Sequence, residues 1–304
     1  MRIFPAVIVA LACITSSCST EMAPPNIVLI LADDLGYCDS ELYGCDSIPT
    51  PNLKRIADEG VLFTAGYVTS PVCSPSRAGL LTGRYQQRYG HEFLPSNDSA
   101  GLPPGEATLA DAMRHAGYTT GMVGKWHLGD RSPSLPNDMG FDSYYGALYS
   151  NDMEPFALYR DREIDIPAPV DQRYLTEHYT NAATAFIEDN AGEPFFLYFA
   201  HNFPHDPLHV RQERLGGSGA GLFGDVIEEI DDSVGAVVET LRESGVLDNT
   251  LIVITSDNGP WYLGDAGNLR GRKGNTFEGG MRVPFIAHWP TQIPAGRVEQ
   301  AMAM

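Results

Sequence analysis

Hydrophobic residues gather in four short continuous runs along the chain, and each run is followed at once by charged or polar residues. The runs are rich in β-branched and aromatic residues, as expected for strands that are covered on both faces of a parallel or mixed sheet. They are NIVLILADD (26–34), TTGMVGKWH (119–127), PFFLYFAHNFPH (194–205) and TLIVITSDNG (250–259). We therefore expect four buried strands with polar residues at their carboxyl ends.

Helical patterns separate these runs. In segment 50–60, Thr50 and Pro51 suit the N-cap and the first position of a helix, and Gly60 suits its end. Apolar residues recur at helical spacing in three further segments, 106–118, 176–190 and 225–245. This alternation predicts a doubly wound α/β domain, in which ligands bind beyond the carboxyl ends of the strands. The glycine-rich stretch 214–224 is predicted to be a mobile loop.

Acidic residues follow two of the four runs in pairs. Asp33 and Asp34 end one run, and Asp257 and Asn258 end another. Neighbouring carboxylates repel each other unless a cation lies between them, and oxygen ligands suit Ca²⁺ or Mg²⁺ better than zinc. A single Asp at a strand end more often caps a helix or forms a turn. Two pairs after two similar strands favour a metal site.

Basic residues and histidines follow the other two runs. Lys125 and His127 end one run, and His205 ends the other. Histidine suits proton transfer near neutral pH, and two histidines at strand ends favour catalysis over a simple surface role. His201 and His209 flank His205 in the sequence and could take its place, so the choice among the three stays open.

A cluster of cations lies in segment 268–284, in a chain with 20 basic and 39 acidic residues. Glycines in this segment let backbone amides and long cations converge on an anion. The alternative is a solvated loop. The cations are Arg270, Arg272, Lys273 and Arg282.

Cys73 opens the stretch CSPSRAGLLTGR (73–84), which looks like an exposed thiol at the start of a helix. Amide dipoles at a helix N-terminus stabilise negative charge, and Arg77 adds a cation one turn later. Together these residues predict a metal-assisted hydrolase that acts on an anionic ester, with a nucleophile at Cys73.

The formal net charge of −19 makes this chain a poor candidate for binding nucleic acid, because phosphate neutralisation needs an excess of Lys and Arg. No nucleic-acid partner is therefore expected. No segment after the N-terminus is long and apolar enough to cross a membrane.

The N-terminus resembles a secretory signal peptide over residues 1–18, with one Arg, an apolar run and then small polar residues. Cys18 lies in a context similar to a bacterial lipoprotein cleavage box, so both a lipid anchor and simple cleavage are open. We expect an exported protein, either periplasmic or a lipoprotein of the outer membrane or cell surface of a bacterium. Cys38 and Cys45 are close enough in sequence to form a disulfide, which leaves Cys73 unpaired.

The stretch 73–84 resembles the signature of the type I sulfatases, which convert the cysteine of C-x-P-S-R to formylglycine. Five further segments resemble motifs of that family in the same order: PNIVLILADDLGY, GKWHLG, HNFPHDP, SDNG and GRKGNTFEGGMRVP. The resemblance covers nearly the whole chain after the signal peptide and is to the arylsulfatase and N-acetylgalactosamine-6-sulfatase type. It implies an alkaline-phosphatase-like α/β fold, with a mixed, mostly parallel sheet between layers of helices, and a sulfatase catalytic domain over residues 24–304.

The resemblance also implies the chemistry of residue 73. A thiolate is soft and oxidisable and matches a hard cation poorly, whereas a hydrated formylglycine aldehyde offers oxygen. In the family, that oxygen attacks sulfur and expels the alcohol, and the resulting sulfate ester then breaks down to aldehyde and sulfate, which is a form of nucleophilic catalysis. A formylglycine-generating or equivalent maturation enzyme is an implied partner.

Roles of the remaining site residues follow from the same resemblance. One Ca²⁺ ion would be held by Asp33, Asp34, Asp257, Asn258 and the modified Cys73. Arg77 would neutralise the nucleophile, and His127 would take the proton that drives elimination. Lys125, Lys273 and His205 would bind the sulfate oxygens, and either His205 or Lys273 would protonate the leaving alcohol.

Two features depart from the family pattern. Family members usually continue into a smaller C-terminal subdomain, which this sequence lacks, so we expect either a fragment or an incomplete product. Segment 137–172 matches no family motif, and either lines the pocket or decorates the surface.

The leading interpretation is a secreted sulfatase that acts on sulfate monoesters, with a small molecule or a sulfated carbohydrate as substrate. The alternatives are a phosphomonoester or phosphonate hydrolase of the same superfamily, and a truncated, inactive protein that binds sulfated glycans.

Overall fold

The four apolar runs form the centre of a single sheet in the computed structural model, which describes residues 23–45, 48–95 and 101–304. They become β1 (Asn26–Ala32), β3 (Thr119–Gly124), β7 (Phe195–Ala200) and β8 (Thr250–Ser256). These strands lie side by side in the order β8-β1-β7-β3 and all run parallel. The prediction of four buried strands is confirmed.

Six further strands extend the sheet on both sides to the order β10-β2-β9-β8-β1-β7-β3-β4-β5-β6. They are β2 (Val61–Tyr67), β4 (Ser143–Gly146), β5 (Leu158–Arg160), β6 (Glu163–Ile166), β9 (Arg282–His288) and β10 (Arg297–Ala303). Within the described residues only β5 and β9 run against the direction of β1. The predicted mixed, mostly parallel sheet is confirmed.

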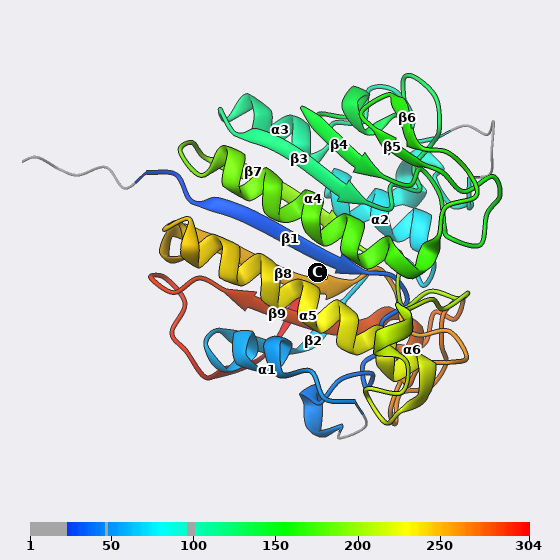
Figure 1. The fold of residues 1–304 in the computed structure, drawn as a ribbon, viewed down its shortest axis with the longest axis vertical. Coiled ribbons are helices and arrows are strands. Elements are labelled where there is room, and N and C mark those ends of the chain that lie inside the picture. Colours follow the sequence, from blue (N-terminus) through cyan, green and yellow to red (C-terminus); the bar gives the residue numbers. More distant parts are fainter. Residues whose placement is uncertain (1–22, 46–47, 96–100) are drawn as a thin grey trace, which may run out of the picture.

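Helices cover both faces of the sheet (Figure 1). One face carries α1 (Pro51–Asp58), α4 (Leu175–Asn190) and α5 (Gly221–Glu243), and the other carries α2 (Cys73–Thr82) and α3 (Leu109–His115). A single turn, α6 (Glu278–Met281), precedes β9. Short 3-10 helices span Leu42–Gly44, Gln86–Tyr89, Pro136–Asp138, Gln172–Tyr174, Gln212–Arg214 and Leu247–Asn249. No helix within the described residues is long and apolar enough to span a bilayer.

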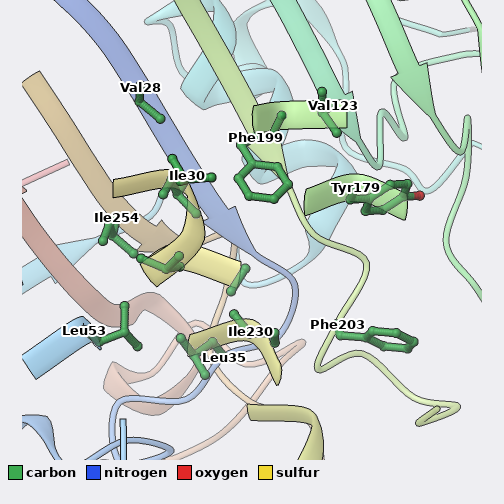
Figure 2. Close-up of a cluster of buried hydrophobic side chains, with 14 of the residues drawn as sticks. Val28, Ile30, Leu35, Leu53, Val123, Tyr179, Phe199, Phe203, Ile230 and Ile254 are labelled. Atoms are coloured by element: carbon green, nitrogen blue, oxygen red, sulfur yellow. The ribbon is translucent and has the colours of Figure 1, made fainter. Parts of the chain in front are cut away.

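Two hydrophobic cores result from the alternation of side chains along β1. Val28 and Ile30 point to the core under α1, α4 and α5, whereas Leu29 and Leu31 point to the core under α2 and α3. Figure 2 shows the first core, in which Ile30 lies close to Ile254 of β8. Burial of each such side chain contributes about 2 kcal/mol, so the central strands are firmly held.

Thr50 is the N-cap residue of α1 and Pro51 its first residue, as predicted, although the Thr50 side chain makes no capping hydrogen bond. The carboxylate of Asp231 in α5 accepts hydrogen bonds from the Asn52 and Leu53 amides instead, at 3.0 and 2.8 Å. The predicted mobile loop 214–224 is shorter than expected, because its last four residues form the first turn of α5.

Cys38 and Cys45 form a disulfide, so that prediction is confirmed. Cys73 is the free cysteine of the described residues. The predicted signal peptide and Cys18 lie outside the described residues, and both remain predictions.

Strand directions bring several distant segments to one edge of the sheet, which we call the carboxyl edge. Because β9 is antiparallel to both β8 and β2, β2 runs in the same direction as β1 and β8. The chain that leaves β2 toward α2 therefore starts at the carboxyl edge, and so does the chain that enters β9. The residues after β1, β3, β7 and β8 lie at this edge as well.

Candidate active site

The two acidic pairs meet at the carboxyl edge because β1 and β8 are paired in register, with Ala32 opposite Ser256. Nδ2 of Asn258 donates to Oδ1 of Asp34 at 2.6 Å, and the amide of Asp34 donates to Oδ1 of Asp257 at 3.2 Å. Both pairs are buried. The structure therefore brings together the four residues that the sequence assigned to a metal.

Cys73 lies at the first position of α2, as predicted, and beside the first acidic pair. One ligand atom from each of Cys73, Asp33 and Asp34 lies within 4.8 Å of the others. The expected exposure is wrong, since Cys73 is only 1% exposed. The segment after β8 contacts the chain just before Cys73, where the Gly274 amide donates to the Pro71 carbonyl at 2.8 Å. Burial raises the pKa of Cys73 to about 11, so the thiol is neutral at pH 7.

Arg77 connects α2 with both acidic pairs. Its Nε donates to Oδ2 of Asp257 at 2.8 Å, and one terminal nitrogen donates to the Lys125 carbonyl at 2.7 Å. The other terminal nitrogen lies 3.8 Å from Oδ1 of Asp33. The guanidinium is fully buried, and a buried cation persists only with such partners. Arg77 therefore fixes the start of α2 against the acidic pairs.

Two lysines approach the acidic cluster from other segments. Nζ of Lys125 bonds to Asp33, and Nζ of Lys273 bonds to Oδ2 of Asp34 at 2.7 Å. Burial alone would raise the pKa of Asp33, but Lys125, His205, Arg77 and Lys273 together lower it below the usual range. Asp33 is therefore ionised in the folded protein.

His127 and His205 complete the cluster with two neutral imidazoles. His127 is buried, and neither ring nitrogen has a hydrogen-bond partner among the described residues. Burial, together with Lys125 and Arg77, lowers the pKa of His127 well below its ordinary value. Nε2 of His205 lies 3.9 Å from Oδ2 of Asp34, and burial lowers the pKa of His205 as well. Both rings can therefore accept protons.

The structure separates His205 from its two neighbours in sequence. His201 is buried beside Phe199, with ring centroids 4.3 Å apart, and burial alone lowers its pKa to about 3. His209 faces Asp171 and Arg173 instead of the acidic pairs. Of the three histidines, His205 is the one that faces the cluster.

Ser150 and Asn151 belong to the cluster although the sequence did not single them out. Ser150 Oγ accepts from Nζ of Lys125 at 3.1 Å and lies 3.4 Å from the His205 ring. Asn151 Oδ1 lies 3.1 Å from Nδ1 of His205. Both lie within segment 137–172, so this part of the segment lines the site. No spacing or charge distinguishes a Ser-Asn pair after a short strand from an ordinary turn.

The acidic cluster fits a hard divalent cation. Oδ1 of Asp33 and Oδ1 of Asn258 are buried without a hydrogen-bond partner among the described residues. Burial raises the pKa of Asp257 to about 7, and the negative charge of Asp33 contributes in the same direction. Oxygen ligands of this kind suit Ca²⁺ or Mg²⁺.

Comparison with known proteins identifies the family. A model of the sulfatase family matches residues 25–303. N-acetylgalactosamine-6-sulfatase of Rattus norvegicus is 40% identical over 311 residues, which cover 92% of this chain and 59% of that protein. Arylsulfatase A of Homo sapiens is 38% identical over 309 residues, which cover 90% and 60% of the two chains. The chain thus spans about 60% of the length of these relatives.

Solved structures agree with this result. Ps i-CgsB in complex with k-i-k-neocarrahexaose superposes with a TM-score of 0.85 at 34% identity, covering 92% of this chain and 69% of that one. The phosphonate monoester hydrolase of Agrobacterium radiobacter superposes with a TM-score of 0.64 at 22% identity, over 91% and 70% of the two chains, which shows a shared fold alone. The family model and the relatives together show that this chain belongs to the sulfatase family.

Proposed function

We propose that residues 24–304 form the catalytic domain of an exported sulfatase that hydrolyses sulfate monoesters of a carbohydrate. One observation carries the proposal. Cys73 at the start of α2, three buried carboxylates and the cations Arg77, Lys125 and Lys273 converge at a single edge of the sheet. Such a site combines a position for a nucleophile, a position for a metal and positive charge for an anionic substrate.

Residue 73 acts as formylglycine in this proposal, and Asp33, Asp34, Asp257, Asn258 and residue 73 hold one Ca²⁺. When bound, the ion would offset the crowded carboxylates and favour the charged form of an oxygen nucleophile. The thiol itself suits the role poorly, because burial raises the pKa of Cys73 to about 11 and sulfur matches a hard cation badly. A maturation enzyme that converts Cys73 is therefore a required partner.

The cations of the site bind and orient the sulfate group. Lys125 pairs with Asp33 and Lys273 pairs with Asp34. In this proposal their ammonium groups lie on either side of the sulfate group that binds next to residue 73. Charge that develops on the sulfuryl oxygens and on the leaving oxygen is stabilised by fixed cations of this kind. Arg77 contacts the carboxylates and so holds the nucleophile in position.

Proton transfers fall to His127 and to either His205 or Lys273. His127 is buried with both ring nitrogens unpartnered among the described residues, which suits a base that accepts a proton from residue 73. The leaving alcohol needs a proton donor, and His205 and Lys273 both lie on the acidic cluster. The neutral His205 ring can donate only after it has gained a proton, whereas the Lys273 ammonium already carries one. Replacing each residue in turn would show which of the two donates the proton.

The substrate class and the cellular location are proposed from the names of similar proteins and from the N-terminal sequence. The names of the relatives, N-acetylgalactosamine-6-sulfatase among them, and the neocarrahexaose complex of Ps i-CgsB support a sulfated sugar as substrate. The signal-like N-terminus supports export to the periplasm or the cell surface, and at Cys18 both a lipid anchor and simple cleavage nearby stay open. The excess of acidic residues argues against a nucleic-acid partner.

A phosphomonoester or phosphonate hydrolase is the second candidate, favoured only by the fold shared with the phosphonate monoester hydrolase. Rates on nitrophenyl sulfate and nitrophenyl phosphate separate the two functions. A clear preference for phosphate would contradict the sulfatase proposal. Binding of sulfated glycans without turnover, in protein carrying a modified residue 73, would support the inactive binding protein.

The decisive experiment is the peptide mass across residue 73, measured in protein expressed with the maturation enzyme. We expect the mass of formylglycine in active protein. The Cys73→Ala variant should lose turnover while it keeps most of its Ca²⁺ binding, because the carboxylates remain. Full activity with an unmodified thiol, or activity of Cys73→Ala, would overturn the mechanism.

A further inference from the structure

Exposed aromatic side chains gather on the segment between β8 and α6, residues 259–277, which we call the aromatic rim. Trp261 is 43% exposed, Tyr262 74% and Phe277 44%. The Trp261 and Tyr262 rings pack edge to face with centroids 4.7 Å apart. Leu263 next to them is 53% exposed. Large apolar groups that cluster in the open usually mark a binding surface.

Sequence and backbone contacts connect the aromatic rim to the active site. It starts directly after Asn258 and contains Lys273, whose amide donates to the Pro260 carbonyl at 3.0 Å. Arg272 donates to the Trp261 carbonyl at 3.0 Å. The Gly274 amide bonds to Pro71, two residues before Cys73. The exposed rings therefore belong to the segment that borders residue 73.

Residues that precede α1 also hold the aromatic rim in place. Oδ1 of Asp39 accepts a hydrogen bond from the Asp265 amide at 2.6 Å, and the Cys38 amide donates to the Asp265 carbonyl at 2.9 Å. The disulfide of Cys38 adds a covalent constraint to this contact. A surface held this way loses little conformational entropy when a ligand binds.

Arg270 gives the aromatic rim a cation that is free for a ligand. Its guanidinium stacks on the Phe277 ring, with Cζ 3.8 Å from the centroid. Arg270 is exposed and has no carboxylate partner among the residues that the structure describes. A planar guanidinium with free N–H groups suits bidentate binding of an oxyanion.

We propose that the aromatic rim is a binding subsite for the sugar next to the one that carries the scissile sulfate. Trp261 and Tyr262 would pack on the apolar face of that sugar ring, and Arg270 would bind its sulfate or carboxylate group. The proposal rests on the sulfatase function above and adds the substrate class, an oligosaccharide with more than one anionic group. Aromatic rings with a polar edge suit the mixed surface of a sugar, and the free cation favours a polyanion over an uncharged partner.

The test compares three single variants, Trp261→Ala, Tyr262→Ala and Arg270→Ala, on a small and a large substrate. The small substrate is nitrophenyl sulfate, and the large ones are hexasaccharides of carrageenan and of chondroitin 6-sulfate. For the hexasaccharide that the wild type turns over, we expect the ratio of its kcat/KM to that of nitrophenyl sulfate to fall about tenfold in each variant. Tenfold corresponds to about 1.4 kcal/mol, and most of the change should appear in KM.

Matched controls are Arg242→Ala, near the end of α5, and Ile164→Ala, an apolar side chain that is 57% exposed in β6. Both should leave the ratio at the wild-type value. An unchanged ratio in the three rim variants, or an equal fall on both substrates, would overturn the proposal. An altered oligomeric state in the rim variants without a fall in the ratio would assign the surface to a protein partner instead.

Binding to the Cys73→Ala variant separates this proposal from the function on which it rests. Calorimetry with the same hexasaccharides should show affinity that Arg270→Ala lowers about tenfold in the Cys73→Ala background. This result without wild-type turnover would retain the subsite and reject the sulfatase. Turnover of nitrophenyl sulfate without detectable binding of either hexasaccharide would retain the sulfatase and reject the subsite.

Discussion

Ser74 follows Cys73 on α2, and its hydroxyl lies 2.8 Å from Nε2 of His91. Both side chains are buried. Burial lowers the pKa of His91 from 6.5 to about 4, so the ring is neutral in the folded protein near neutral pH. This hydrogen bond therefore joins the residue next to Cys73 to a neutral imidazole.

Replacing His91 by Gln should change the pH dependence of stability. In wild type the unfolded chain binds a proton at His91 below about pH 6.5, while the folded chain does not until about pH 4, so stability is lost as the pH falls through this window. We expect wild type to be more stable than His91→Gln by about 1 kcal/mol near pH 7, from the buried hydrogen bond. Since one pKa unit corresponds to about 1.4 kcal/mol, wild type should lose about 2 kcal/mol relative to His91→Gln between pH 7 and pH 5, so that the variant becomes the more stable protein near pH 5.

Urea unfolding of both proteins at the two pH values, with Ca²⁺ present, measures the difference. His288→Gln serves as a comparison. Burial lowers the pKa of His288, as it does that of His91, but Glu59 offsets part of this shift. A stability difference between wild type and His91→Gln that is the same at both pH values would contradict the assignment of a neutral, buried His91.

Sequence reasoning located the site residues that directly follow a strand or start a helix. Asp33, Lys125 and Asp257 are of this kind, because a buried strand fixes where the next side chain lies. Ser150 and Asn151 were missed, since their place depends on how a loop of segment 137–172 folds against His205. The burial of Cys73 was also mispredicted, because burial depends on tertiary packing that a local sequence pattern does not show.

At the scale of elements, Gly124 determines how β3 ends and how Lys125 enters the site. It has a positive φ of 108° and lies against β7. A Cβ at this position would lie 1.7 Å from the Ala200 carbonyl oxygen. That oxygen accepts the amide hydrogen bond of Lys125 at 2.8 Å. The close approach of β3 and β7 at the carboxyl edge thus requires glycine here.

Gly124→Ala should destabilise the protein by more than about 3 kcal/mol, through backbone strain and through a clash that no side-chain rotation relieves. Activity of any folded protein should fall strongly, because Lys125 shifts. Gly117→Ala is the matched control, since Gly117 also has a positive φ of 89° but has open space around it. It should cost only about 1 kcal/mol. Equal losses of stability in the two variants, measured by urea unfolding, would show that the cost comes from the positive φ alone and not from the clash with Ala200.

The pattern of apolar runs predicted the centre of the fold but not its margins. Strands β1, β3, β7 and β8 are covered on both faces and so appear as continuous apolar runs. Strand β2 is only partly buried along most of its length, so its sequence VLFTAGY carries no such signal. Strands of three or four residues, such as β5, acquire their structure from pairing and cannot be read locally.

At the scale of the whole molecule, an acidic chain of net charge −19 has brought three carboxylates together in its interior. Arg77, Lys125 and Lys273 contact these carboxylates directly. Burial, with the negative charge of Asp33, nevertheless raises the pKa of Asp257 to about 7, so its ionised form is disfavoured. A divalent cation among these oxygens would favour the ionised form, which links metal binding to the stability of the entire domain.

Removal of Ca²⁺ should therefore lower the stability of wild type. At a concentration of about 100 times its dissociation constant, one ion contributes about 2.7 kcal/mol, which corresponds to a shift in Tm of about 5 °C in a domain of this size. The Asp34→Asn variant should show a much smaller shift between EGTA and Ca²⁺, because one ligand charge is lost. Asp248→Asn, at an exposed acid in the 3-10 helix before β8, should retain the full shift.

Each protein is compared with itself in EGTA and in Ca²⁺, so the effect of a mutation on stability without the ion cancels. Absence of any shift in wild type would reject the cation site, and a full shift in Asp34→Asn would place the stabilising ion elsewhere on the chain.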